Sequence, residues 1–240
     1  MTKYMNILIV FFILTLSGCA TVHEMGLKKT DQKVSLNNEG LALMSIEVNN
    51  QYKPDYQPQI LVINVETPNA ESKKDRHNFK TDLAGTAASS NGSRYLIRMK
   101  LKPGEYIARA ALCQYRSIFL MATCQIPIHG EFKVNAGEII YLGRVSATMR
   151  ERHDDEFRAG PVIPLVDQNV SGFASSTFDI TISDQKKEDL KAFTENFPAL
   201  RSENIKASVL PDFDREQAQL WWKTNGSKGK RRIKKNTSQL

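Results

Sequence analysis

The chain has 240 residues, and its 33 Lys and Arg against 26 Asp and Glu give a formal net charge of +7. The last 18 residues, Lys223–Leu240, hold seven of these cations and no acid, and Lys3 lies near the start; without these, residues 19–222 hold 25 cations against 26 acids. A basic folded body is therefore excluded, and the positive charge belongs to the tail. The length suffices for one hydrophobic core with extensions.

The segment Met1–Ala20 has the features of an export signal. Lys3 precedes an apolar run from Ile7 to Leu16, which is too short to span a bilayer as a permanent helix. The following Leu16-Ser17-Gly18-Cys19 resembles the bacterial lipoprotein signal. This resemblance implies a signal peptide over residues 1–18, and a diacylglyceryl group on Cys19 at the mature N-terminus. The alternative is an ordinary secreted protein with a cysteine near its cleavage site by chance.

The residues after Cys19 indicate where the anchor lies. In the lipoproteins that this chain resembles, Asp after the cysteine retains the protein at the inner membrane, and this chain has Ala20. The resemblance therefore implies the periplasmic face of the outer membrane of a Gram-negative cell. Acyl chains on one cysteine make such attachment durable. Residues 19–38 are polar without a clear period, which predicts a lipidated tether.

A β domain is predicted over residues 39–200. Period-2 patterns bounded by Gly, Pro and Asn are typical of antiparallel strands, and we expect an antiparallel β-sandwich. In the first strand, Leu41, Leu43, Ser45 and Glu47 alternate with Ala42, Met44, Ile46 and Val48. The predicted strands are 41–49, 59–67, 93–101, 105–113, a short one at Phe132 and Val134, 138–145 and 177–183.

Loops and turns separate these strands. Pro103-Gly104 and Asn135-Ala136-Gly137 are predicted turns in which glycine takes a positive φ. The long polar segment 68–92 is predicted to be a surface excursion, and 148–176 is predicted to be irregular.

Two helices are expected after the last strand. Asp184 can cap the first, which should end at Pro198 and bury Leu190, Phe193 and Phe197 on one stripe. The second is predicted at 212–223, within a C-terminal helical region over 201–222. The tail 223–240 lacks apolar periodicity and is predicted to be disordered.

The segments LKPGEYIARAAL and FKVNAGEIIYLGRV support a family resemblance. They are similar to parts of small bacterial envelope lipoproteins with a transthyretin-like β-sandwich, in which Pro-Gly-x-Tyr and Ala-Gly-x-x-Tyr turns enter strands. The closing pattern from Asp184 through Asp189 to Pro198 also looks like the end of such lipoproteins. The resemblance covers roughly residues 40 to 200 and implies fold and location more than activity.

Two cysteines remain if Cys19 is lipidated. Cys113 and Cys124 then allow only one pairing, and an oxidising periplasm favours that disulfide. The alternative is two buried thiols. Between them lie the apolar residues Ile118, Phe119, Leu120 and Met121. Exposed at a loop tip, these would make a protein or membrane contact. We favour the alternative that Phe119 and Leu120 fold back into the core.

The remaining polar clusters do not predict catalysis. His153-Asp154-Asp155-Glu156 is the densest group of metal or acid-base side chains, but four adjacent residues cannot all face one point, and we interpret it as a solvated loop. We find no nucleophile elbow, phosphate loop or zinc-helix motif. The sequence therefore predicts no catalytic residue, no metal and no cofactor.

The basic tail is the sharpest charge feature. Export argues against nucleic acid as its partner, so anionic lipid or peptidoglycan is the expected contact. Trp221-Trp222 before it would lie at the membrane interface or pack on the sheet, and the tail would bind anions or only solubilise the chain. The candidate anion-binding residues are Lys228, Lys230, Arg231, Arg232, Lys234 and Lys235.

Three functions are compatible with these patterns. The leading hypothesis is a lipid-anchored, non-catalytic accessory or structural component of an envelope assembly, with an envelope protein as partner. The second is an envelope binding module for a glycan or small ligand. The third, a hydrolase that uses His153 and its acidic neighbours, has the least support because no site geometry accompanies it.

Overall fold

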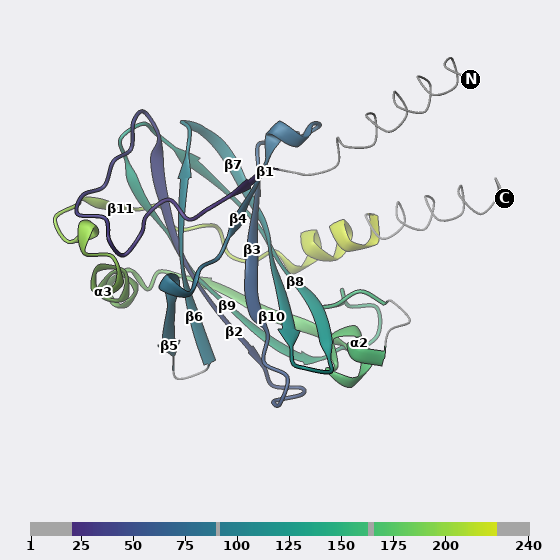
Figure 1. The fold of residues 1–240 in the computed structure, drawn as a ribbon. Helices are drawn as coiled ribbons and strands as arrows, with labels where there is room; N and C mark the ends of the chain where they lie inside the picture. The colour runs from purple at the N-terminus through teal and green to yellow at the C-terminus, as the bar shows by residue number, and fades with distance from the viewer. Residues whose placement is uncertain (1–20, 90–91, 163–165, 225–240) are drawn as a thin grey trace, which may run out of the picture.

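The structure is a computed structural model that describes residues 21–89, 92–162 and 166–224. The predicted signal peptide, Cys19 and the predicted anion-binding residues of the tail lie outside the described residues. Eleven strands make the described part of the chain mainly β, in two sheets (Figure 1). No helix among the described residues has the length and apolar character needed to span a bilayer.

Sheet A has five strands in the order β1-β4-β3-β7-β8. In that order their bounds are Thr21–His23, Arg76–Lys80, Gln59–Glu66, Gly104–Arg116 and Met121–Val134. Sheet B has the order β10-β9-β2-β6-β5, and β11 pairs with β9. Their bounds are Ser176–Ser183, Ile139–Glu151, Gly40–Asn50, Gly92–Leu101 and Thr86–Ser89, with β11 at Ile205–Ala207.

Both sheets are mixed, which corrects the expected antiparallel arrangement. β2 runs parallel to β9, β1 parallel to β4 and β11 parallel to β9. The reason is that the chain changes sheet after β1, β2, β4, β6 and β8. The two turns predicted between strands, after β6 and after β8, are therefore corners between sheets. Gly137 has the expected positive φ of 72°, whereas Gly104 begins β7 without one.

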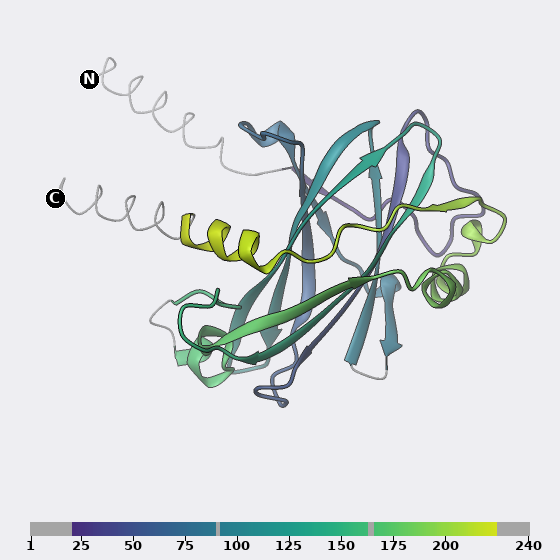
Figure 2. The ribbon, with the colours of Figure 1, turned by 180° about the vertical axis from the view of Figure 1, so that it is seen from behind.

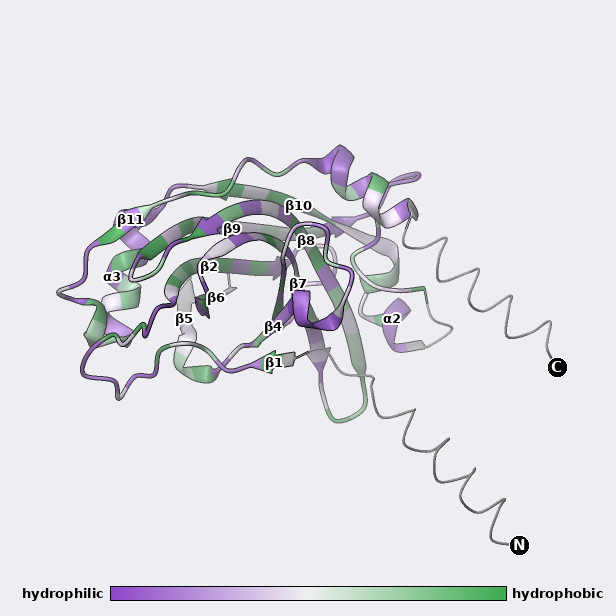
Figure 3. Cartoon of the chain, turned by 90° about the horizontal axis from the view of Figure 1, so that it is seen from above, coloured by the Kyte–Doolittle hydropathy of each residue, from purple (hydrophilic) through white to green (hydrophobic). Residues whose placement is uncertain are grey.

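The alternation predicted in the first strand is confirmed, and each face of β2 belongs to a different core. Ala42, Met44, Ile46 and Val48 face the main core between the two sheets. Leu41 and Leu43 face a second core on the outer side of sheet B. Figure 3 shows hydrophobic stretches in the strands of sheet B, with hydrophilic residues between them. Such a two-faced strand is buried on both sides, as only a central strand can be.

The first predicted helix is confirmed as α3, Lys186–Asn196, followed by the 3-10 turn η4, Pro198–Leu200. Asp184 Oδ1 accepts a hydrogen bond of 2.9 Å from the backbone N–H of Lys186 at its start. Phe193 and Phe197 are fully buried in the second core, and Leu190 packs against it. A helix at 215–224 matches the second prediction. Figures 1 and 2 show it and α3 on opposite sides of the sheets.

The tether predicted before residue 39 is wrong for its described part, 21–38. Thr21–His23 forms β1, and Met25 and Leu27 are buried. Between them, the Gly26 N–H donates to the Arg98 carbonyl at 2.7 Å, and a Cβ at Gly26 would lie 2.7 Å from Lys100 Cβ. The segment therefore covers β6, because two apolar side chains and a close backbone approach outweigh its polar composition.

Two segments predicted to be irregular contain regular structure. Residues 68–92 hold η1 (Lys73–Asp75), β4, η2 (Leu83–Gly85) and β5, because polar strands can lie at or near a sheet edge. Residues 148–176 include the end of β9, α2 (Val166–Val170) and η3 (Phe173–Ser175). β8 also starts at Met121, well before the predicted Phe132, because its outer residues include Pro127 and His129, which break the apolar pattern.

Candidate functional site

The predicted disulfide between Cys113 and Cys124 is present in the β7–β8 hairpin, where three residue pairs separate it from the turn at the tip. The two residues are direct cross-strand partners with a Cα–Cα distance of 4.8 Å, and both are buried. Closing a loop of this length stabilises a fold by roughly 2–3 kcal/mol in the chain-entropy model. The bond also holds the register of the hairpin that projects beyond it.

The tip of this hairpin exposes large apolar side chains. Ile118 and Phe119 are 91% and 93% exposed, and Met121 is 54% exposed. Only Leu120 is half-buried against the main core. The favoured prediction that Phe119 folds back is therefore wrong, and the alternative of an exposed tip holds. The cause is a tight turn in which the Ser117 N–H donates to the Leu120 carbonyl at 2.8 Å, which directs the intervening side chains outward.

A cleft of about 500 Å³ lies on the outer face of sheet A, beside the same disulfide. Leu61 and Leu112 line it from the sheet, and Trp221 and Trp222 line it from the helix 215–224. The two tryptophans thus pack on the sheet, as one of the two predicted alternatives has it. Arg158, Thr123 and Gln125 add polar groups. Strand alternation was the only sequence signal for Thr123 and Gln125, and Arg158 lies in a loop where that signal does not apply.

His129 packs against the helix 215–224 through Trp221. Its ring lies 5.2 Å from that of Trp221, between centroids, and its Nδ1 lies 2.8 Å from Arg109 Nη1. It is 7% exposed and has a φ of 56°. Burial, followed by the positive charge of Arg109, lowers the pKa of His129 to about 4. The imidazole is therefore neutral near pH 7, and its role is packing and positioning.

A buried ionic network fixes α3 on sheet B. Asp189 is fully buried and accepts hydrogen bonds from Ser45 Oγ, Tyr141 OH (2.5 Å) and the Arg144 guanidinium. Arg94 also approaches Asp189, at 3.6 Å from its Oδ1, and donates to Glu47 at 2.7 Å. Two guanidiniums therefore share a small volume with several carboxylates. Ser45, Arg94 and Arg144 are alternating polar side chains of β2, β6 and β9, and Asp189 comes from α3.

This network is structural in character. Burial and the hydrogen bond to Asp189 raise the pKa of Tyr141 well above its ordinary value. For Arg144, burial opposes the charged form, but Asp189, Glu47 and Glu188 raise its pKa overall. Every carboxylate in the network is engaged by a guanidinium, which leaves none free to act as a base. The network stabilises the docking of α3 instead.

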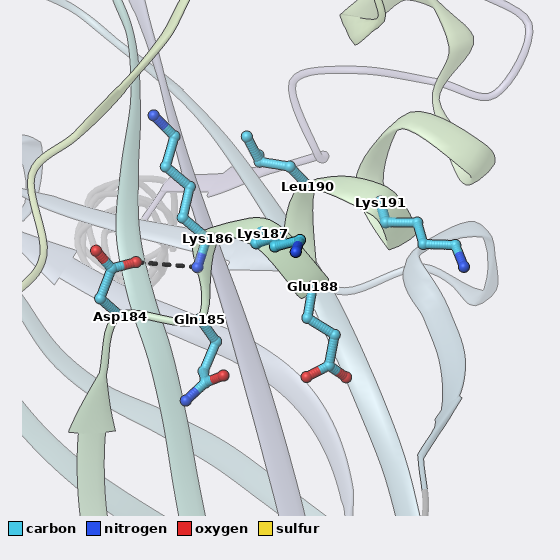
Figure 4. A pocket seen from close by; sticks show the side chains of 7 residues that line it. All are labelled: Asp184, Gln185, Lys186, Lys187, Glu188, Leu190 and Lys191. Carbon is cyan, nitrogen blue, oxygen red and sulfur yellow. Dashed lines mark hydrogen bonds between the residues drawn. The ribbon is translucent and has the colours of Figure 1, made fainter.

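A hollow of about 820 Å³ lies along the start of α3 (Figure 4). All of its lining residues come from the single segment 184–191, so it is the open side of a helix without an opposing wall. Glu188 within it is already bound to Arg94 at 2.6 Å and to Arg144 at 3.1 Å. This hollow does not form a binding site.

The loop His153–Glu156 matches the prediction of a mixed-charge loop. Glu156 binds Arg150 at 2.6 Å and Arg215 at 3.2 Å, which ties the helix 215–224 to β9. The charge of Arg150, through hydrogen bonds, lowers the pKa of Glu156 to about 2 despite partial burial. Within the described ranges, no three His, Cys, Asp or Glu side chains are placed to hold a metal ion.

The sites predicted from sequence thus fall into two groups. Cys113, Cys124 and the tip residues lie on one hairpin, next to the tryptophan cleft, whereas Cys19 and the basic tail residues from Lys228 to Lys235 lie outside the described residues. No family model, curated protein or solved structure matches the chain. The hairpin and the cleft are therefore the features from which a function can be inferred.

Proposed function

We propose that the protein is a lipid-anchored periplasmic protein, held by acyl chains on Cys19 at the outer membrane. Its role is non-catalytic, as an accessory or structural component of an envelope assembly. It contacts a protein partner through the hairpin tip formed by Ile118, Phe119 and Met121. The observation that carries this proposal is the exposure of Ile118 and Phe119 at 91% and 93% beside a disulfide-held hairpin.

Two adjacent large apolar side chains exposed at one tip indicate a binding partner. Single exposed apolar residues are ordinary on protein surfaces, but a contiguous patch on a rigid element is typical of an interaction site. Cross-linking the hairpin close to its tip lowers the conformational entropy that binding would otherwise cost. The tip is therefore suited to insertion into an apolar pocket of another protein.

The position of β1 supports a protein partner for the tip over the anchoring membrane. Thr21 follows Cys19 by two residues. The cross-strand pairing through β4 and β3 places Thr21 at the same level of sheet A as Ala108 on β7. The strand continues from Ala108 to Arg116, which is roughly 27 Å at about 3.4 Å per residue. Because residues 19 and 20 span at most about 7 Å, an anchor at Cys19 holds the β1 end at the membrane and the tip away from it.

Two further features fit this location. The two-sheet arrangement with α3 and the helix 215–224 is compatible with the transthyretin-like β-sandwich of the lipoproteins that the sequence resembles. The tail residues Lys228, Lys230, Arg231, Arg232, Lys234 and Lys235 would contact anionic lipid or peptidoglycan. Each cation near an anionic surface contributes about 1 kcal/mol, and salt weakens this contribution.

The anchor is tested by substitution of Cys19. We expect Cys19→Ser to abolish acylation and to move the protein from the membrane fraction to the soluble fraction, because no other durable anchor is proposed. Fractionation of cells, with intact-mass measurement of the N-terminal peptide, checks this result. A Cys19→Ser protein that still fractionates with membranes would contradict the anchor.

The tip is tested by a matched pair of surface variants. The double variant Ile118→Ser, Phe119→Ser should lose a stoichiometric partner on purification from detergent-solubilised envelopes. Leu83→Ser, at a residue 92% exposed outside the hairpin, should retain it. Both variants should melt within about 2 °C of the wild-type protein, because exposed side chains contribute little to stability. A partner retained by the tip variant rejects the proposed contact.

A second candidate function rests on the tryptophan cleft. An envelope binding module for a glycan or small ligand needs a concave, mostly apolar site with a few polar groups, and volumes of roughly 300–1,000 Å³ are typical of such sites. The cleft of about 500 Å³ beside Trp221 and Trp222 meets this description. Contact at the tip and ligand binding in the cleft are compatible in one protein.

A further inference from the structure

The cleft is built by elements that the chain brings together from distant positions. Leu61 of β3 and Leu112 of β7 lie on the outer face of sheet A, opposite to the core-facing Ile60 and Cys113. The helix 215–224 provides one wall with its two tryptophans, and the segment 158–161 provides another. The floor is apolar and partly open, since Leu112 is 37% exposed.

The charge at this cleft is positive and uncompensated. Arg158 donates from Nη1 to the Ala174 carbonyl at 2.6 Å, and no carboxylate of the described chain pairs with it. Arg152, whose guanidinium lies 5.9 Å from the ring centre of Trp222, binds the Glu156 carbonyl and has no carboxylate partner in the described residues either. The carboxylate of Glu156 itself is taken by Arg150 and Arg215.

The environment of Arg158 also favours an anionic ligand. Burial, followed by the charge of Arg152, lowers the pKa of the Arg158 guanidinium from its ordinary value. A ligand carboxylate in the cleft would offset both effects and would accept hydrogen bonds from the guanidinium, which suits carboxylates well. The side-chain amide of Gln125, which makes no hydrogen bond within the described part of the chain, is available for a neutral polar group of the same ligand.

We infer that this cleft binds a carboxylate-bearing sugar, with its ring against the indoles and its carboxylate on Arg158. Aromatic rings pack well on the apolar C–H face of a sugar ring, and Gln125 and Thr123 would bind its hydroxyl or amide groups. Charge complementarity selects an acidic sugar over a neutral one. The choice of a sugar among small carboxylates rests on the envelope location proposed above, whereas the cleft shares no residue with the hairpin tip.

Tryptophan fluorescence reads this site directly, because Trp221 and Trp222 are the only tryptophans in the chain. The full chain in detergent is titrated with N-acetylmuramic acid and, separately, with N-acetylglucosamine, which has the same ring without the lactyl carboxylate. We expect saturable quenching, with the acidic sugar bound at least tenfold more tightly. Lactate alone should not compete at the same concentrations, because it lacks the ring.

Variants at Arg158 and Gln125 test which residue causes the preference for the acidic sugar. Arg158→Gln should weaken binding of the acidic sugar about 10- to 100-fold and leave that of the neutral sugar unchanged, as expected for a charged hydrogen bond of about 1.5–3 kcal/mol. Gln125→Ala should weaken both sugars, and it serves if Arg158→Gln fails to fold. Arg201→Gln, at an exposed arginine outside the cleft, is the control.

The inference would be overturned by the absence of saturable quenching by the acidic sugar, by equal affinity for the two sugars, or by unchanged selectivity in Arg158→Gln. Competition by lactate as strong as by the acidic sugar would assign the cleft to small carboxylates and would also reject a sugar site. Co-purification through the Phe119 tip is measured separately, so each site is accepted or rejected on its own.

Discussion

Asp189→Ala is expected to lower the free energy of unfolding by about 3–5 kcal/mol, the usual cost of removing one partner from a buried ion pair. Asp189 is fully buried and accepts hydrogen bonds from Ser45, Tyr141 and Arg144. Without it, two hydroxyls and a guanidinium remain buried with fewer partners. Denaturant unfolding monitored by circular dichroism measures the change in stability.

Glu188→Ala is the matched control for this prediction. Glu188 is the preceding residue on α3 and binds the same two arginines, but its side chain is 55% exposed. Solvent screens such a pair, so the expected cost is below about 1 kcal/mol. Equal losses in the two variants would show that burial of Asp189 does not hold α3 on sheet B.

His129 is expected to make the protein sensitive to acid. Its pKa is about 4 in the folded protein, because burial and Arg109 disfavour the charged ring, and about 6.5 in the unfolded chain. The unfolded state therefore binds the proton more readily. The stability from neutral His129 is fully present above pH 6.5 and is lost as the pH falls toward 4. At pH 4.5 the loss from this residue amounts to about 2.5 kcal/mol.

His129→Asn isolates this effect from other titrating groups. Asparagine tolerates the φ of 56° at this position and does not titrate. The free energy of unfolding is measured at pH 7 and pH 4.5 for both proteins, and the decrease should be about 2.5 kcal/mol smaller in the variant. Equal decreases in the two proteins would assign the acid response to groups other than His129.

The parts of the fold that depend on local pattern could be predicted from the sequence. The alternation in β2 assigns Met44 and Leu43 to opposite faces because side chains alternate along a strand. The stripe of Phe193 and Phe197 predicts the packing of α3, because residues four apart lie on the same face of a helix. The disulfide followed from the predicted export together with the single pairing that the two remaining cysteines allow.

Features that depend on distant partners could not be predicted in this way. The parallel pairing of β2 with β9 requires the chain to change sheets between them, and no local pattern encodes that path. Asp189 resembles an ordinary solvent-facing helix residue until Arg94 and Arg144 are placed beneath it. Phe119 was favoured as buried because most phenylalanines are, and only the turn geometry exposes it.

The candidate sites show the same division. The sequence drew attention to the residues between the cysteines and to the tryptophan pair, because both are apolar in unusual places. It gave no indication that Arg158 would lie beside Trp222 without a carboxylate partner among residues 21–89, 92–162 and 166–224, since that depends on which acids Arg150 and Arg215 occupy.

Site-specific photo-crosslinking in intact cells tests the central claim most directly. A photoreactive amino acid replaces Phe119 in one strain and Leu83 in another, two positions with nearly equal exposure on different parts of the surface. The account predicts one discrete protein adduct from position 119 and none of the same mass from position 83. Adducts to lipid alone from position 119, or the same protein adduct from both positions, would contradict a protein contact at the hairpin tip.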